Sequence, residues 1–216
     1  MHMASPDFSP SAERNKQPIL ELLQTLLPDT GHALEIASGT GQHVVWFARH
    51  LPQWTWQPTD AHVGALHNIE ANIELNSTLN STEDPKRDEL DNIHAPLKLD
   101  VLQSPWPLDD QSFDLVLCLN MLHIAPWESC AALMQGCARH LSPAGVLVTY
   151  GPYLEDGVPT ATSNLAFDQS LRAHDLGWGL RRREDVEVQA TLAGLTLHAR
   201  HSMAANNLLL VFGRRT

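Results

Sequence analysis

The sequence predicts an α/β fold in which an open, mostly parallel sheet carries helices on both faces. Strand-sized apolar runs alternate with segments of helical periodicity through most of the 216 residues. This alternation is typical of doubly wound sheets with right-handed crossovers. In addition, the glycine turn Ser38-Gly39-Thr40-Gly41 joins the first apolar run to the first crossover helix, which is where such sheets commonly bind a ligand.

The hydrophobic pattern places each element in turn. The first helix has Ser11 as a candidate N-cap, while Pro18 offers an alternative start as a first-turn proline. A turn at Pro143-Ala144-Gly145 precedes the fifth strand. The expected helices are 11–27, 42–50, 63–75, 127–140, 164–173 and 184–193. The expected strands are 32–37, 54–59, 97–101, 113–119, 146–150, 196–200 and 207–212.

The chain has the length of one domain, and we expect residues 1–216 to form it. Residues 1–30 are expected to make an N-terminal cap segment. The polar and charged stretch 76–94 is expected to be a flexible excursion from the domain.

Composition and charge exclude several classes of function. Lys and Arg number 14 against 25 Asp and Glu, a formal net charge of −11, whereas binding to a phosphate backbone is driven by basic side chains. No apolar run approaches the roughly 20 residues of a membrane-spanning helix. The three cysteines lack C-x-x-C spacing and indicate a reduced, cytoplasmic chain, and the 12 histidines show no zinc-ligand spacing. We therefore expect no nucleic-acid, membrane or metal partner.

The glycine turn and a carboxylate that follows it indicate a bound nucleoside. A strand that runs into such a turn and then into a helix lets the backbone approach a ligand, with helix N–H groups directed at it. Asp60 lies 21 positions after Gly39, at the end of the second expected strand. A carboxylate in this position accepts hydrogen bonds from ribose hydroxyls. The pair predicts a cofactor that contains adenosine.

Two further residues distinguish between adenosine cofactors. A dinucleotide fingerprint has a third glycine three positions after Gly41, where it allows close approach to the pyrophosphate. Val44 occupies that position. Glu35, inside the first expected strand, would repel a pyrophosphate but would favour a sulfonium or an ammonium group. The layout therefore favours S-adenosylmethionine, which carries both cations and a ribose, over NAD(P).

Residues 35–41 resemble motif I of the class I S-adenosylmethionine-dependent methyltransferases, acid-x-G-x-G-x-G, with Ala37 in the first glycine position. Alanine is tolerated there if the backbone is not left-handed. Almost end to end, the chain is also similar to an uncharacterised methyltransferase-like family. The shared stretches are S-A-E-R-N-K at 11–16, E-I-A-S-G-T-G-Q-H at 35–43, N-M-L-H-I-A-P-W-E at 120–128, Y-G-P-Y at 150–153 and A-N-N-L-L at 205–209.

The resemblance implies a Rossmann-like, seven-stranded methyltransferase fold with an antiparallel last strand, and S-adenosylmethionine as the cofactor. Residues 151–183 occupy the place of a substrate-side insertion in this class. The implied cofactor-binding residues are Glu35, Ala37, Ser38, Gly39 and Gly41 at the methionine end, Asp60 at the ribose, Asp100 and Val101 at the adenine, and Asn120 and Met121 closing the pocket. For Asp100 there is an alternative interpretation, as the cap of a turn.

Methyl transfer is an in-line displacement, in which an enzyme positions the nucleophile, excludes water and in some cases removes a proton. His123 is a candidate general base with a pKa near neutrality, or else a structural residue. Tyr150 and Tyr153 are candidates for orienting the acceptor. The candidate substrate-binding residues are Arg14 and Asn15, in an N-terminal lid, and Asn164, in the insertion.

These observations predict a methyltransferase that acts on a small molecule, or on a protein, as a monomer or a homodimer. The alternatives are an NAD(P)-dependent oxidoreductase and a catalytically silent protein that binds S-adenosylmethionine. No motif indicates the acceptor or the atom that receives the methyl group.

Overall fold

The sheet is divided between two units of the chain. The computed structural model describes residues 7–79 and 90–215, which belong to one unit within residues 1–99 and a second within 100–216. The strand order is β3-β2-β1 in the first unit and β4-β5-β9-β8 in the second. These seven strands form one mostly parallel sheet. The predicted fold class is therefore confirmed.

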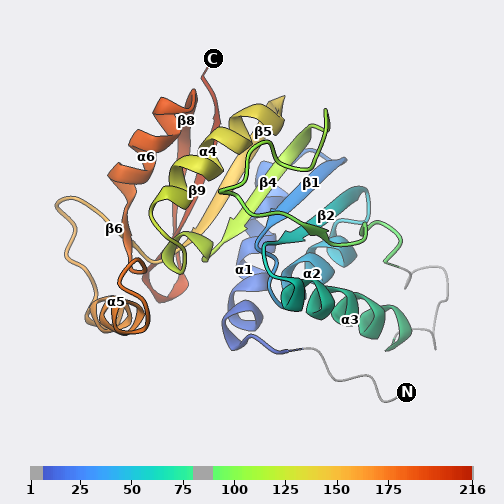
Figure 1. The fold of residues 1–216 in the computed structure, drawn as a ribbon, viewed down its shortest axis with the longest axis horizontal. Coiled ribbons are helices and arrows are strands. Elements are labelled where there is room, and N and C mark those ends of the chain that lie inside the picture. The colour runs from blue at the N-terminus through green and yellow to red at the C-terminus, as the bar shows by residue number, and fades with distance from the viewer. Residues whose placement is uncertain (1–6, 80–89, 216) are drawn as a thin grey trace. The chain divides into compact units, whose positions relative to one another are not determined.

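The first unit contains parallel strands, an N-terminal helix and two crossover helices, drawn from blue to green in Figure 1. β1 (Gly31–Ile36) pairs with β2 (Trp54–Asp60), and β2 pairs with β3 (Leu97–Lys98). The helices are α1 (Pro10–Leu26), α2 (Gln42–His50) and α3 (Val63–Leu79). Each crossover helix follows its strand directly, as the alternation of apolar patterns predicts.

Burial of large apolar side chains holds the first unit together. Leu34 and Ile36 of β1 are buried, as are Phe47 of α2 and Ile69 of α3. The Phe47 ring packs on Trp56 of β2 with their centroids 5.7 Å apart. Since each such side chain contributes about 1.5–3 kcal/mol when it leaves water, this core fixes the ends of β1 and β2, where the glycine turn and Asp60 lie.

The second unit combines parallel and antiparallel pairing. β4 (Phe113–Leu119) is parallel to β5 (Leu141–Gly151), whereas β9 (Asn207–Arg214) is antiparallel both to β5 and to β8 (Leu195–Met203). The antiparallel last strand is thus confirmed. The helices of this unit are α4 (Glu128–His140), α5 (Thr162–His174) and α6 (Arg183–Leu192). Short helical turns lie at η1 (Met121–His123) and η2 (Ala204–Asn206).

A two-stranded parallel sheet in the second unit was not predicted. β6 (Tyr153–Leu154) pairs with β7 (Arg181–Arg182). Each strand has only two residues, which is too short for a period of two to show in the sequence. The pairing brings the two ends of the predicted insertion 151–183 together, with α5 between them.

The start of the first helix differs from the prediction. α1 begins at Pro10, and its N-cap is Ser9, whose Oγ accepts a hydrogen bond from the Ala12 N–H at 3.3 Å. The choice of Ser11 as N-cap is therefore wrong, and Pro18 lies inside the helix rather than at its start. A proline at the first helical position has no N–H to leave unsatisfied, which explains why the helix starts at Pro10.

Three other boundaries are corrected. α3 continues to Leu79, beyond the predicted end at 75, and residues 80–89 of the predicted excursion lie outside the described residues. β3 stops at Lys98 instead of 101, because Asp100 caps a turn in which its Oδ1 accepts a hydrogen bond from the Leu102 N–H at 2.9 Å. The expected turn at 143–145 lies within β5, where the register with β4 shifts.

Within the described ranges, no helix combines the length and the apolar character needed to cross a membrane. The same ranges hold no cluster of three or more His, Cys, Asp or Glu side chains arranged to bind a metal ion.

Candidate functional site

The glycine turn has an unusual backbone at three alternate positions. Ala37, Gly39 and Gly41 have φ angles of 56°, 59° and 76°. All three lie in the left-handed region, which glycine adopts freely and alanine adopts at a cost of about 1–2 kcal/mol. Alanine was expected to be tolerated at position 37 only if the backbone there is not left-handed. The structure does not meet this condition, and Ala37 carries strain at the entrance to the turn.

The two glycines of the turn differ in the space around them. A Cβ on Gly41 would lie 2.9 Å from the Ile69 Cα of α3, whereas a Cβ on Gly39 would have only the Ala37 carbonyl oxygen within 4.0 Å. Gly41 thus allows the start of α2 to approach the backbone of α3. Gly39 has open space beside it, which leaves its backbone accessible to a ligand.

Asp60 connects the end of β2 to the glycine turn. Its Oδ2 accepts a hydrogen bond from the Gly39 N–H at 3.1 Å, and its Oδ1 accepts one from the His62 N–H at 3.0 Å. The Ser38 N–H donates to the Thr59 carbonyl at 2.8 Å, and Thr59 donates to Ser38 Oγ and to the Glu35 carbonyl, so that several hydrogen bonds join the two strand ends. Asp60 is thus at the strand end expected of the ribose carboxylate, and it also shapes the turn.

Glu35 is a buried carboxyl group with one oxygen that has no partner. The residue is 2% exposed, and among the described residues its Oε2 makes no hydrogen bond. Burial raises the pKa of Glu35 to about 8; hydrogen bonding to Ser38 opposes the rise and the charge of Asp60 adds to it. A buried polar atom without a partner is costly, so this oxygen is suited to a donor or cation supplied by a ligand.

The N-terminal helix is attached to the first turn of α2, next to the glycine turn. Asn15 is buried, and its Oδ1 lies 2.6 Å from Nε2 of His43. The Ser9 N–H donates to Gln42 Oε1 at 2.6 Å. Arg14, by contrast, is exposed, and its side chain donates a hydrogen bond to Ser11 Oγ at 3.3 Å. Asn15 therefore belongs to the support of the turn in this structure, and the predicted substrate role of both residues stays a prediction.

The other predicted cofactor residues lie in the second unit. Asp100 and Val101 are in the turn after β3, where Asp100 acts as the cap described above and the Val101 carbonyl accepts a hydrogen bond from Trp106 Nε1 at 3.3 Å. Asn120 follows β4 with a φ of 62°, and its N–H donates to the Tyr150 carbonyl at 2.8 Å. Met121 is buried in η1. Their contacts with a cofactor stay predictions.

His123 does not have the pKa expected of a general base. It is 1% exposed, and neither ring nitrogen has a hydrogen-bond partner among the described residues. Burial, together with the charge of Arg181, lowers its pKa to about 3. Its ring packs edge-on against Tyr153 at 5.0 Å and lies against Gly151, where a Cβ would approach Nε2 to 2.3 Å. The expected near-neutral pKa is wrong because the imidazole is fully desolvated.

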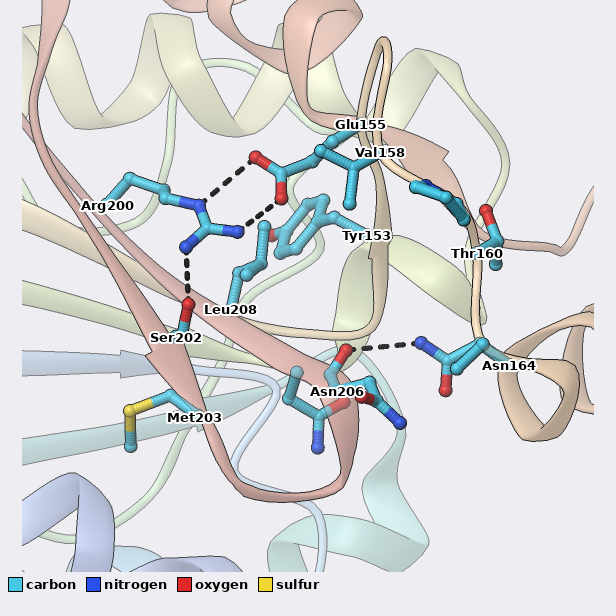
Figure 2. Close-up of a pocket in the computed structure, with 13 residues that line it drawn as sticks. Tyr153, Glu155, Val158, Thr160, Asn164, Arg200, Ser202, Met203, Asn206 and Leu208 are labelled. Atoms are coloured by element: carbon cyan, nitrogen blue, oxygen red, sulfur yellow. Dashed lines mark hydrogen bonds and ion pairs between the residues drawn. The ribbon is translucent and has the colours of Figure 1, made fainter.

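Both tyrosines are buried, Tyr150 near the end of β5 and Tyr153 in β6, and both have hydroxyl partners. Tyr150 accepts a hydrogen bond from Asn207 Nδ2 at 2.8 Å, and Tyr153 donates to Thr149 Oγ1 at 2.9 Å. Burial raises the pKa of Tyr153. Tyr153 also lines a pocket that includes Asn164, whose Nδ2 donates to the Asn206 carbonyl at 3.1 Å (Figure 2). Among the predicted residues, the structure thus brings Tyr150, Tyr153 and Asn164 to one region.

Sequence reasoning missed two charged residues of this pocket. Glu155 and Arg200 form an ion pair, and the pair spans 45 positions of the chain. Isolated charges of opposite sign at such a separation are not a recognisable pattern. The nearest available signal was the A-N-N-L-L stretch at 205–209, part of which forms the turn between β8 and β9 and lines the same pocket.

A family model described as "Protein of unknown function (DUF938)" matches residues 6–214. The chain belongs to this family. Because the match covers nearly the whole chain, it includes the glycine turn, Asp60 and the pocket beside Asn164. The description of the family names no reaction.

Solved methyltransferase structures resemble the DUF938 chain in fold. An O-methyltransferase family protein from Burkholderia thailandensis has a TM-score of 0.75 at 17% identity, over 95% of this chain and 58% of that one. A putative O-methyltransferase from Nostoc punctiforme PCC 73102 has a TM-score of 0.75 at 17% identity, over 93% and 56%. CalO1, a methyltransferase in calicheamicin biosynthesis solved in its SAH-bound form, has a TM-score of 0.70 at 15% identity, over 95% and 55%. This chain thus spans under two thirds of each neighbour, and the likeness shows the methyltransferase fold.

The residues of the first unit fit S-adenosylmethionine. The cofactor has a sulfonium, an ammonium group and a ribose with two hydroxyls. Glu35 offers a buried oxygen that has no partner among residues 7–79 and 90–215, and the open side of Gly39 leaves the backbone of the turn accessible. Asp60 keeps further lone pairs on its two oxygens, since a carboxylate accepts about four hydrogen bonds. Val44, at the third glycine position of a dinucleotide site, is fully buried instead.

Proposed function

We propose that this DUF938 protein is an S-adenosylmethionine-dependent methyltransferase that acts on a small-molecule acceptor. The observation that carries the proposal is the buried Oε2 of Glu35, which has no partner in the part of the chain that the structure describes and lies beside a left-handed glycine turn that is fixed to Asp60. The methyltransferase fold of the solved neighbours and the bound SAH of CalO1 support it. S-adenosylmethionine would supply an electrophilic methyl group on its sulfonium.

The chain's own contribution to this chemistry is binding and orientation. Glu35 would accept a hydrogen bond from, or pair with, a cationic group of the cofactor, and Asp60 would accept hydrogen bonds from the ribose. In the ligand-free protein at pH 7, a pKa of about 8 keeps the Glu35 carboxyl mostly protonated. Since a nearby cation favours the carboxylate, binding would release this proton from Glu35.

The test is isothermal titration calorimetry with S-adenosylmethionine and SAH at pH 7, in two buffers of different ionisation enthalpy. Wild type is expected to bind both and to release close to one proton per S-adenosylmethionine. The Glu35→Gln variant is expected to bind at least ten-fold more weakly, without proton release. Glu70→Gln, which removes an exposed carboxylate of the same unit, serves as the control and is expected to match wild type.

Several outcomes would contradict the proposal. Absence of binding to both ligands at millimolar concentration would reject the cofactor. Thermal stabilisation by NADH but not by SAH would favour the oxidoreductase. If both ligands bind, a cell extract supplied with methyl-labelled S-adenosylmethionine should yield a labelled product. Binding without any labelled product would indicate a silent cofactor-binding protein.

A further inference from the structure

A pocket of about 190 Å³ in the second unit lies outside the cofactor assignment. One wall comes from residues 153–164, which follow β5 and lead into α5. The other wall comes from residues 200–208 of the β8–β9 hairpin. In Figure 2, Arg200 points toward Glu155 at one end of the pocket, and Asn164 points toward Asn206 at the other. The pocket is therefore closed on two sides by contacts between its walls.

The pocket lies at the carboxyl end of the parallel strands of this unit. Gly151, the last residue of β5, pairs with Leu208, which lines the pocket. The hydrogen bond from the Asn120 N–H to the Tyr150 carbonyl brings the end of β4 to the same edge. In doubly wound sheets, ligands bind outside the carboxyl ends of the strands.

The hairpin that forms one wall has a strained tip. Ala205 and Asn206 have φ angles of 58° and 55°, so two consecutive residues other than glycine lie in the left-handed region. Such conformations are retained where the surroundings enforce them, and they cluster at ligand sites. Here the surroundings are the Asn164 bond to the Asn206 carbonyl and the bonds from Asn207 Nδ2 to the Tyr150 hydroxyl and the Ala204 carbonyl, at 2.8 and 3.2 Å.

The charges in the pocket are already compensated. Arg200 donates from Nε to Glu155 Oε1 at 3.1 Å and from Nη2 to Oε2, while its Nη1 donates to Ser202. Arg183 also donates to Glu155, at 3.1 Å. All three guanidinium nitrogens of Arg200 therefore have protein partners. A charged ligand could pair with Arg200 or Glu155 only if it broke the bidentate ion pair between them.

The polar groups that remain for a ligand are uncharged. Within the described part of the chain, the Thr160 hydroxyl and the Asn206 side-chain amide make no hydrogen bond, and Asn164 uses only its Nδ2. Val158 and Leu208 add apolar surface. The lining thus combines hydroxyl and amide groups with apolar contact, and its volume is below the roughly 300–1,000 Å³ of sites for drug-sized ligands.

We infer that this pocket binds the methyl acceptor, and that the acceptor is a small, uncharged molecule with a hydroxyl or amide group next to an apolar part. The role as acceptor rests on the proposed function. The preference for an uncharged ligand rests on the pocket alone.

The test uses four probes of one size: benzyl alcohol and benzamide, which are uncharged, and benzoate and benzylamine, which are charged. Binding is measured by ligand-observed NMR on the full chain. Ala161→Leu enlarges a side chain that lines the pocket and makes no hydrogen bond through its methyl group. Ala166→Leu is the control, at an exposed position of α5, the helix whose N-cap is Ala161; Ala166 does not line the pocket. SAH binding to each variant is measured by calorimetry.

Wild type and Ala166→Leu are expected to bind the two uncharged probes, and Ala161→Leu to bind them at least ten-fold more weakly while its affinity for SAH is unchanged. Tighter binding of benzoate or benzylamine, equal binding by Ala161→Leu, or SAH binding with no probe bound would each overturn the inference. If the probes bind in the expected pattern but the protein does not bind SAH, the preference of the pocket for uncharged ligands stands and the methyltransferase proposal is rejected.

Discussion

Ala37 is the one position at which the glycine turn departs from the motif, and its backbone still has the conformation that the motif requires. A Cβ at a φ of 56° is strained. Replacement by glycine removes this strain and makes the unfolded chain more flexible, which opposes part of the gain. Ala37→Gly is therefore expected to raise the free energy of unfolding by up to about 1 kcal/mol, as measured by urea denaturation.

The matched control for this change is Ala71→Gly, in the interior of α3. There glycine relieves no strain and only weakens the helix, so that the free energy of unfolding should fall by about 1 kcal/mol. Destabilisation of the same size by both substitutions would show that Ala37 is not strained.

The sequence was sufficient to locate Glu35, Asp60 and the turn between them, because each is defined by residue type and spacing. It did not predict the state of His123. The pKa of about 3 comes from complete burial against Tyr153 and Gly151, and the sequence pattern gives no measure of burial for a histidine that follows a strand. Catalysis by His123 stays a prediction, for which a neutral imidazole would have to serve as the base.

At the scale of elements, the close contact between α2 and α3 depends on the lack of a side chain at Gly41. Gly41→Ala introduces a Cβ at 2.9 Å from the Ile69 Cα, in addition to left-handed strain. Gly39→Ala introduces only the strain. We expect Gly39→Ala to cost about 1–2 kcal/mol of unfolding free energy and Gly41→Ala a further 1–3 kcal/mol, roughly the cost of overpacking.

Both variants are compared by urea denaturation, and circular dichroism checks that the helix content is retained. The order of the two effects is the informative result. If Gly39→Ala were as destabilising as Gly41→Ala, the close approach of α2 to α3 would not explain the second glycine.

Element boundaries were predictable where a hydrophobic pattern ends abruptly. α2 and β4 match their predicted ranges: Gly41 precedes α2 and Pro52 lies two residues after it, while Ser112 and Asn120 flank β4. The prediction failed at β3, where the apolar pattern runs on past Lys98 although the Asp100 turn ends the strand. It also missed β6 and β7, which are too short for any period, and could not indicate that they pair across nearly thirty residues.

At the scale of the whole molecule, three buried groups predict how stability depends on pH. His43 and His123 have pKa values of about 4 and 3, lowered by burial from 6.5, so the unfolded chain binds more protons than the folded one as the pH falls below 6.5. Glu35 has a pKa of about 8, raised by burial from 4.5, so the folded protein binds more protons between pH 4.5 and 8.

The two histidines therefore lower the stability as the pH falls from 6.5, and Glu35 lowers it as the pH rises toward 8. Each proton difference changes the unfolding free energy by about 1.4 kcal/mol per pH unit. We expect maximum stability near pH 6.5, measured by urea denaturation between pH 5 and 9. Glu35→Gln should abolish the decline from pH 6.5 to 8, which Glu70→Gln should retain. If the stability of Glu35→Gln still declines between pH 6.5 and 8, a group other than Glu35 causes the decline.

The attachment of α1 to α2 has a consequence for motion. Ser9 and Asn15 hold Gln42 and His43, the first two residues after the glycine turn. Any ligand that immobilises the turn also removes freedom from these side chains, and through them from the start of α1. Occupancy of the turn should therefore appear as slower amide hydrogen exchange in a helix that begins more than twenty residues earlier in the chain.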